Sequence, residues 1–104
     1  MTDFIVSPGE DIAIKSVEDV EVPRKYKVLL LNDDYTTMDF VVDVLYDIFH
    51  KSEAEAEAIM LAVHENGMGI AGVYIKSIAE AKIAATHRRA RAEGFPLRCT
   101  LEAE

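Results

Sequence analysis

The hydrophobic positions along the chain repeat with different periods, and each period predicts a different kind of element. Residues 24–31 are predicted to form a strand, and the apolar residues Tyr26 and Val28–Leu31 within it are typical of a central strand buried on both faces. In residues 40–49 the apolar positions recur at helical spacing, which indicates one buried helix face. Leu97, Cys99 and Leu101 alternate with polar residues, and this period of two predicts a last, half-buried strand.

A serine or threonine followed three residues later by an acid is a common signature of a helix start. The signature occurs in Thr36 with Asp39, Ser52 with Glu55, and Ser77 with Glu80. The first pair predicts Thr36 as the N-cap and Thr37 as the first helical residue. The second and third helices are predicted to end at Gly67 and Gly94, because glycine commonly follows the last turn of a helix.

Residues 67–72 match the pattern Gly-x-Gly-x-x-Gly literally. As a dinucleotide site this pattern requires a strand before it and a helix after it. Here a predicted helix precedes the glycines, and residues 73–75 are typical of a strand. We therefore interpret Gly67, Gly69 and Gly72 as flexible turn glycines.

The predicted elements follow the order strand, helix, helix, strand, helix, strand. This order indicates an α+β fold in which three helices cover one face of a three-stranded, mostly antiparallel sheet. The 104 residues are enough for one modest hydrophobic core. Residues 1–23 have no sustained period and end at Pro23, so we predict a flexible acidic tail followed by a single core domain at 24–104.

The formal net charge of −8 is concentrated in the predicted tail, which holds six acids and one lysine. Such an acidic chain is repelled by phosphates, which argues against nucleic acid as a partner. The one basic cluster consists of Arg88, Arg89 and Arg91, with Arg98 nearby in the sequence. We interpret the first three mainly as last-turn helix residues that the helix dipole favours, and less readily as a phosphate-binding patch.

The sequence also predicts where the protein works. No apolar run approaches the roughly 20 residues that a membrane span needs. The first residues lack the basic start and apolar core of a signal peptide, and Cys99 is the single cysteine. We therefore expect a cytoplasmic protein that does not enter a membrane.

The candidate catalytic residues do not form a pattern typical of an enzyme. Cys99 occupies an inward strand position, which favours packing, and His50, His64 and His87 fall in different helices without metal-ligand spacing. The adjacent Asp33 and Asp34 would point apart on an extended chain. We expect no catalysis, metal or cofactor; a small hydrolase that uses Asp33 or Asp34 is kept as a weaker hypothesis.

A binding site at the end of the first strand fits the residues better. If Asn32, one of the two aspartates and neutral His64 converge there, they supply hydrogen-bond acceptors and a negative charge beside apolar side chains. A primary ammonium has three donors and no acceptor, so such a site suits an amine attached to a hydrophobic group. Met60 and Val63 share a helix stripe with His64, and this spacing alone favours an ordinary core or helix-terminus histidine.

Three blocks of the sequence resemble the ClpS family, the bacterial adaptor of the ClpA–ClpP protease. They are YKVLLLNDDYTTMDFV at 26–41, MLAVH at 60–64 and PLRCTLE at 96–102. The resemblance covers residues 24–104. It implies a monomeric adaptor that binds proteins beginning with Leu, Phe, Tyr or Trp and delivers them to a ClpA-type AAA+ ATPase.

The resemblance also assigns roles by position. Asn32, Asp34 and His64 would hydrogen-bond the α-amino group of the substrate. Met38 would exclude the β-branched residues Ile and Val. The side-chain pocket would be lined by Leu30, Leu31, Thr36, Met38, Val41, Met60, Val63 and Leu97.

The chain departs from the family pattern at two positions. Thr37 stands where the family commonly has proline, which implies a slightly less rigid helix start. Ser77 stands where better-known relatives have an acid on the ATPase-docking face, whereas Glu80 and Lys82 match that face. The alternative function is a non-proteolytic binding module, because the family fold resembles the C-terminal domain of the ribosomal stalk protein L7/L12.

Overall fold

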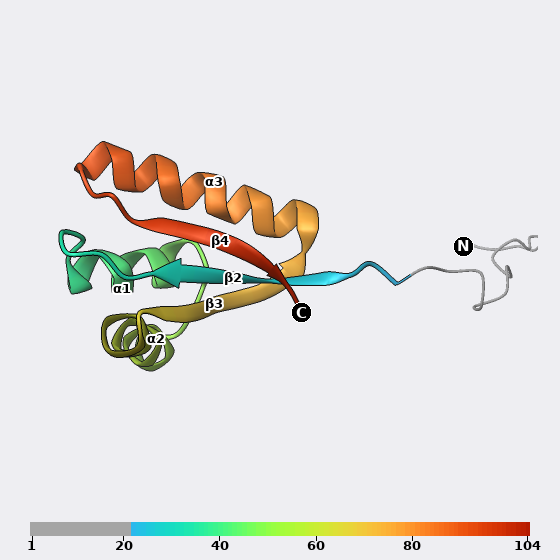
Figure 1. Ribbon diagram of the computed structural model, residues 1–104, viewed down its shortest axis with the longest axis horizontal. Coiled ribbons are helices and arrows are strands. Elements are labelled where there is room, and N and C mark those ends of the chain that lie inside the picture. The colour runs from blue at the N-terminus through green and yellow to red at the C-terminus, as the bar shows by residue number, and fades with distance from the viewer. Residues whose placement is uncertain (1–21) are drawn as a thin grey trace, which may run out of the picture.

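The computed structural model describes residues 22–104, which form three strands and three helices (Figure 1). Residues 1–21, nearly all of the predicted tail, lie outside the described part. In chain order the elements are β2 (Lys25–Leu31), α1 (Met38–Asp47), α2 (Glu53–Asn66), β3 (Met68–Ile75), α3 (Lys76–Glu93) and β4 (Arg98–Ala103). The predicted order of strands and helices is therefore confirmed.

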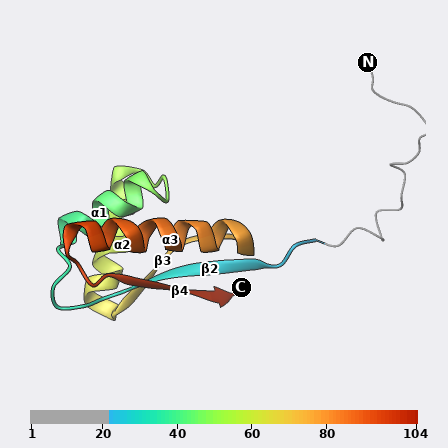
Figure 2. The same ribbon diagram turned by 90° about the horizontal axis from the view of Figure 1, so that it is seen from above.

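The sheet has the order β3-β2-β4, and both pairings are antiparallel. The apolar strand β2 lies in the centre, where Leu30 pairs with Gly69 on one side and Cys99 on the other. Figure 2 shows α1 and α3 on one side of β2 and β4. The predicted α+β class, with helices covering one sheet face, is confirmed.

The core lies between this sheet face and the helices. Val28 and Leu30 are fully buried in it, and Val44 and Leu45 of α1 are equally inaccessible. Cys99 is 95% buried there, since its exposed fraction is 5%. Cys99 therefore packs in the core, as its strand position predicted.

The second predicted capping box is present at the start of α2. The backbone N–H of Glu55 donates to Ser52 Oγ at 3.1 Å, and the backbone N–H of Ser52 donates to Glu55 Oε1 at 3.0 Å. The predicted helix ends are also confirmed, because Gly67 and Gly94 adopt positive φ angles of 91° and 80°. Glycine adopts this left-handed conformation without the steric cost that other residues meet.

The other two predicted capping boxes are wrong. The N-cap of α1 is Thr37, whose Oγ1 accepts from the backbone N–H of Phe40 at 3.1 Å, and α1 begins one residue later than expected. The Thr36 hydroxyl does not accept from α1 but donates to Asp33 Oδ2 at 2.7 Å. Strand β3 runs directly into α3 at Lys76, so Ser77 lies inside the helix and Ile75 is an N-cap without a side-chain hydrogen bond.

The interpretation of the three glycines as turn residues holds only for Gly67. Gly69 and Gly72 lie within β3, which is longer than the three residues predicted. A Cβ atom on Gly69 would lie 2.9 Å from Val63 Cγ2 and 3.1 Å from the carbonyl oxygen of Ile59. Gly69 is therefore the position at which the backbone of α2 packs closely against β3.

We predict that Gly69→Ala lowers the free energy of unfolding by about 1–3 kcal/mol, because the added methyl group overpacks the contact with α2. Alanine in a strand is otherwise slightly favourable relative to glycine, so the sign of the change tests the contact itself. Denaturant unfolding would measure the change. In the background Val63→Ala the same substitution should cost less, and an equal cost in both backgrounds would contradict the contact.

His87 supplies a second prediction, which concerns pH. Its Nε2 accepts a hydrogen bond from the backbone N–H of Cys99 at 3.1 Å, which requires the neutral ring. Partial burial, together with the positive charges of Arg91 and Arg98, lowers the pKa of His87 below its ordinary value. The unfolded chain therefore binds the proton more readily than the folded chain.

The contribution of His87 to stability should be complete above pH of about 6.5 and should be lost as pH falls below that value. In His87→Gln this part of the pH dependence should disappear. Unfolding free energies measured between neutral pH and mild acid would test this. If the unfolding free energies of the wild-type protein and His87→Gln change equally with pH, His87 does not cause the pH dependence.

Candidate functional site

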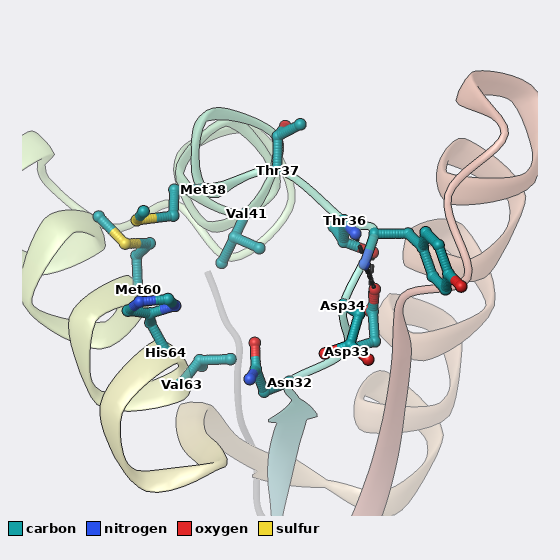
Figure 3. Close-up of a pocket in the computed structure, with 11 residues that line it drawn as sticks. Asn32, Asp33, Asp34, Thr36, Thr37, Met38, Val41, Met60, Val63 and His64 are labelled. Carbon is teal, nitrogen blue, oxygen red and sulfur yellow. Dashed lines mark hydrogen bonds between the residues drawn. The ribbon is translucent and has the colours of Figure 1, made fainter.

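A cavity of about 500 Å³ opens where β2 ends and the chain turns into α1 (Figure 3). The loop after β2 forms one wall, and α1 and α2 form the others. Its lining consists of Asn32, Asp33, Asp34, Tyr35, Thr36, Thr37, Met38, Val41, Met60, Val63 and His64. The cavity thus combines residues that are up to 32 positions apart in the sequence.

The loop is folded by the carboxylate of Asp33. Asp33 Oδ1 accepts from the backbone N–H groups of Tyr35 at 2.8 Å and Thr36 at 2.7 Å. Asp33 Oδ2 accepts from the Thr36 hydroxyl at 2.7 Å. Partial burial by itself would raise the pKa of Asp33, but the hydrogen bonds from Thr36 and Tyr35 outweigh it and lower the pKa. Asp33 is therefore an ionised residue that holds the loop.

A backbone hydrogen bond ties the loop to α2. The N–H of Asn32 donates to the carbonyl oxygen of Gly67, the C-cap of α2, at 2.9 Å. In Figure 3 the side chain of Asn32 extends into the space between the loop and α2, on which Val63 and His64 lie. The side chains of Asn32, Asp34 and His64 are exposed at the cavity. The structure thus brings the three predicted polar residues to one cavity.

The apolar part of the cavity has a buried floor and an exposed edge. Val41 and Val63 are 5% and 3% exposed, so they form the floor. Met38 is 47% exposed at the start of α1, and Met60 is half-buried on α2. Figure 3 shows the two methionine side chains next to each other on one side of the cavity.

Three of the predicted pocket residues do not line this cavity. Leu30 and Leu97 are buried in the core, and Leu31 is half-buried on β2 opposite Met68. Their contact with a ligand stays a prediction.

The sequence reasoning did not assign Asp33, Tyr35 and Thr37 to the pocket, although all three line it. Asp33 could have been found from its position, because an aspartate that precedes a turn often accepts from backbone N–H groups two or three residues later. Thr37 could have been found as the alternative N-cap. Tyr35 is 76% exposed, and its neighbours in the sequence give no signal for a place in the lining.

The predicted docking residues lie on α3, away from the cavity lining. Glu80 is exposed, whereas Lys82 is half-buried. Lys82 Nζ donates to the carbonyl oxygen of Ile48, the C-cap of α1, at 2.6 Å. The same ammonium lies 5.8 Å from the ring centroid of Phe49 and 5.3 Å from that of Tyr74. Lys82 therefore stabilises the end of α1, and its contact with an ATPase stays a prediction.

Two further features concern the chemistry available to the described residues. Within residues 22–104, no three side chains of His, Cys, Asp or Glu are grouped as a metal site would require. Burial raises the pKa of Cys99 to about 11, so its thiol is protonated at neutral pH.

None of the helices in residues 22–104 has the length and apolar composition needed to cross a membrane.

The geometry defines what the cavity can bind. Asn32, Asp34 and His64 provide acceptors and a negative charge, and the valines and methionines provide apolar surface beside them. Because Asp33 already accepts three hydrogen bonds within the loop, Asp34 is the carboxylate available to a ligand. The arrangement suits a cation attached to an apolar group.

The chain is similar to known proteins along its whole length. The model of the ClpS family, described as ATP-dependent Clp protease adaptor protein ClpS, matches residues 21–100. The ATP-dependent Clp protease adapter protein ClpS of Oleidesulfovibrio alaskensis is 56% identical over 102 residues, which cover 98% of each chain. The protein of the same name from Deinococcus radiodurans is 52% identical over 99 residues, which cover 93% of this chain and 88% of the relative.

A solved structure is similar in fold as well as in sequence. Agrobacterium tumefaciens ClpS2 bound to L-phenylalaninamide matches with a TM-score of 0.76 and 40% identity, over 80% of this chain and 100% of that chain. The family match, the relatives and the shared fold agree. The chain therefore belongs to the ClpS family of adaptor proteins of the ATP-dependent Clp protease.

Proposed function

We propose that this protein binds the N-terminal residue of proteins that begin with Leu, Phe, Tyr or Trp and delivers them to a ClpA-type AAA+ ATPase for degradation. The observation that carries the proposal is a single cavity in which three polar side chains adjoin an apolar floor. The related ClpS2 structure supports it, because L-phenylalaninamide joins an α-amino group to an aromatic side chain. Membership of the ClpS family favours a protease adaptor over a ribosomal-stalk-like binding module.

The polar residues would bind the α-amino group. A protonated amine donates three hydrogen bonds, and Asn32 Oδ1, the Asp34 carboxylate and a neutral His64 ring nitrogen are three acceptors. Asp34 would also supply the charge that favours an ammonium over a neutral group. Hydrogen bonds to charged groups contribute about 1.5–3 kcal/mol each, before the cost of ordering the ligand.

The apolar residues would bind the first side chain. Burial of a Leu or Phe side chain contributes about 1.5–3 kcal/mol, which is comparable to one charge-assisted hydrogen bond. Val41 and Val63 would contact the end of that side chain, and Met38 would limit its width near Cβ. Neither half of the cavity suffices alone, so both a free amine and a large unbranched or aromatic side chain are needed.

Delivery requires a second surface. By the family resemblance we assign the ATPase contact to α3 around Glu80 and Lys82, with Glu80 as the exposed member of the pair. The role of Lys82 at the end of α1 would then place that contact on a rigid part of the fold. The docking surface and the cavity have no residue in common, which would allow substrate and ATPase to bind together.

One prediction of the proposed function concerns the amine. A peptide that begins with Leu should bind at least about tenfold more tightly than its N-acetylated copy, because acetylation removes the charge and two of the donors. Isothermal titration calorimetry would measure both affinities. Asp34→Asn should weaken binding of the free peptide, and Asp43→Asn, which removes an exposed acid of α1 outside the cavity, should not. Equal affinities for the two peptides would contradict the proposal.

Another prediction of the proposed function concerns Met38, the methionine at the edge of the cavity. Met38→Ala should strengthen binding of peptides that begin with Ile or Val by about tenfold, since the substitution makes room for a branched Cβ. Met68→Ala is the matched control, because Met68 is 49% exposed, close to the 47% of Met38, and lies outside the cavity lining. Rejection of Ile that persists in Met38→Ala would show that another residue sets the selectivity.

A further inference from the structure

A second hollow of about 310 Å³ lies between the end of α3 and the start of β4. We call it the cationic groove and define it by its lining, His87, Ala90, Arg91, Phe95, Pro96, Leu97 and Arg98. None of these residues carries a negative charge. In a chain with a net charge of −8, a groove of this composition calls for an anionic occupant.

The positive charge of the cationic groove is not neutralised within the described residues. Arg91 and Arg98 form no ion pair in residues 22–104, whereas Arg89 on the same helix pairs with Asp47 at 2.7 Å. Both guanidinium groups act on His87, since their charges contribute to lowering its pKa. The three side chains therefore share one electrostatic environment.

The cationic groove also has an apolar side. Phe95 is half-buried, with its ring centroid 4.9 Å from that of Phe40, and Pro96 is exposed, whereas Leu97 is 3% exposed and offers an occupant almost no surface. Two guanidinium groups beside an apolar surface favour a carboxylate that is accompanied by hydrophobic side chains. An inorganic anion would use only the first of these features.

We propose that the cationic groove binds the distal acids of the chain's own N-terminal segment, which we define as Asp3, Glu10 and Asp11. Residues 1–21 hold six acids and one lysine, so they carry most of the excess negative charge of the chain. Asp3 is followed by Phe4 and Ile5, and Asp11 by Ile12, which match the apolar side of the groove.

The length of the segment fits this assignment. Arg98 pairs with Leu31 at one end of β2, and Val22 precedes the other end of this strand, which begins at Lys25. Val22 is nine residues from Leu31, and about 3.3 Å per residue places it roughly 30 Å from the end of β2 at which the groove lies. The distal acids are separated from Val22 by 11–19 residues, which can span at most roughly 40–68 Å. This reach exceeds the distance from Val22 to the groove, so the distal acids can bind there.

The proximal acids, Glu18, Asp19 and Glu21, provide a built-in control. Glu18 is the farthest of them from Val22, and about four residues extend at most roughly 14 Å. The proximal acids therefore cannot reach the groove, although they carry the same total charge as the distal acids.

The test compares two full-length variants by NMR. One neutralises the distal acids (Asp3→Asn, Glu10→Gln, Asp11→Asn) and the other the proximal acids (Glu18→Gln, Asp19→Asn, Glu21→Gln). Neutralising the distal acids should lower the titration midpoint of the His87 ring and shift the backbone amide signals of Leu97 and Arg98. Neutralising the proximal acids should leave both unchanged. Molar salt should remove the difference, because it screens charges beyond about 3 Å.

The groove itself is tested by Arg98→Gln, which should abolish the difference between the wild-type and distal-acid-neutral segments. Arg88→Gln is the matched control, because Arg88 is an exposed arginine of α3 outside the groove lining. If the distal and proximal variants behave alike, the effect is one of net charge and the proposal is overturned. It is also overturned if neither variant changes the signals while an added acidic peptide does, because the groove then serves a separate partner.

Discussion

The hydrogen bonds to the Asp33 carboxylate are the interaction on which the candidate site depends. They fold the chain between β2 and α1 and orient the Thr36 hydroxyl toward Asp33, while the next residue, Thr37, caps α1. Since Asp33 is held by the loop, Asp34 is left to face the cavity. One carboxylate thus has a structural role, and the adjacent one lines the cavity, where the proposed function assigns it the charge for binding.

The second half of the cavity is positioned by the way α2 meets the sheet. Gly69 lets α2 approach β3, and the hydrogen bond from Asn32 to Gly67 joins the end of α2 to the loop. Val63 and His64 therefore stand at a fixed distance from Asn32. On the far side, Lys82 holds the end of α1. The polar and apolar halves of the site are consequently carried by elements that are joined to one another by hydrogen bonds and close packing.

Periodicity and turn chemistry predicted the fold class, the order of elements and the ends of α2 and α3, because Ser52, Gly67 and Gly94 act locally. Prediction failed where a distant or competing partner decides the structure. Thr37 caps α1 while the Thr36 hydroxyl donates to Asp33, and Gly69 permits a close contact with Val63, which lies on another element. The polar site residues were identified by the family resemblance, whereas the positions of Leu30 and Leu97 depend on packing that spacing cannot reveal.

The central claim is that one cavity recognises an α-amino group and the side chain attached to it. The most direct measurement is a crystal structure of the protein with a peptide that begins with Leu. The account predicts the peptide nitrogen within hydrogen-bonding distance of Asn32, Asp34 and His64, with the leucine side chain against Val41 and Val63. A peptide whose amino group points into solvent, or that binds outside this cavity, would contradict it.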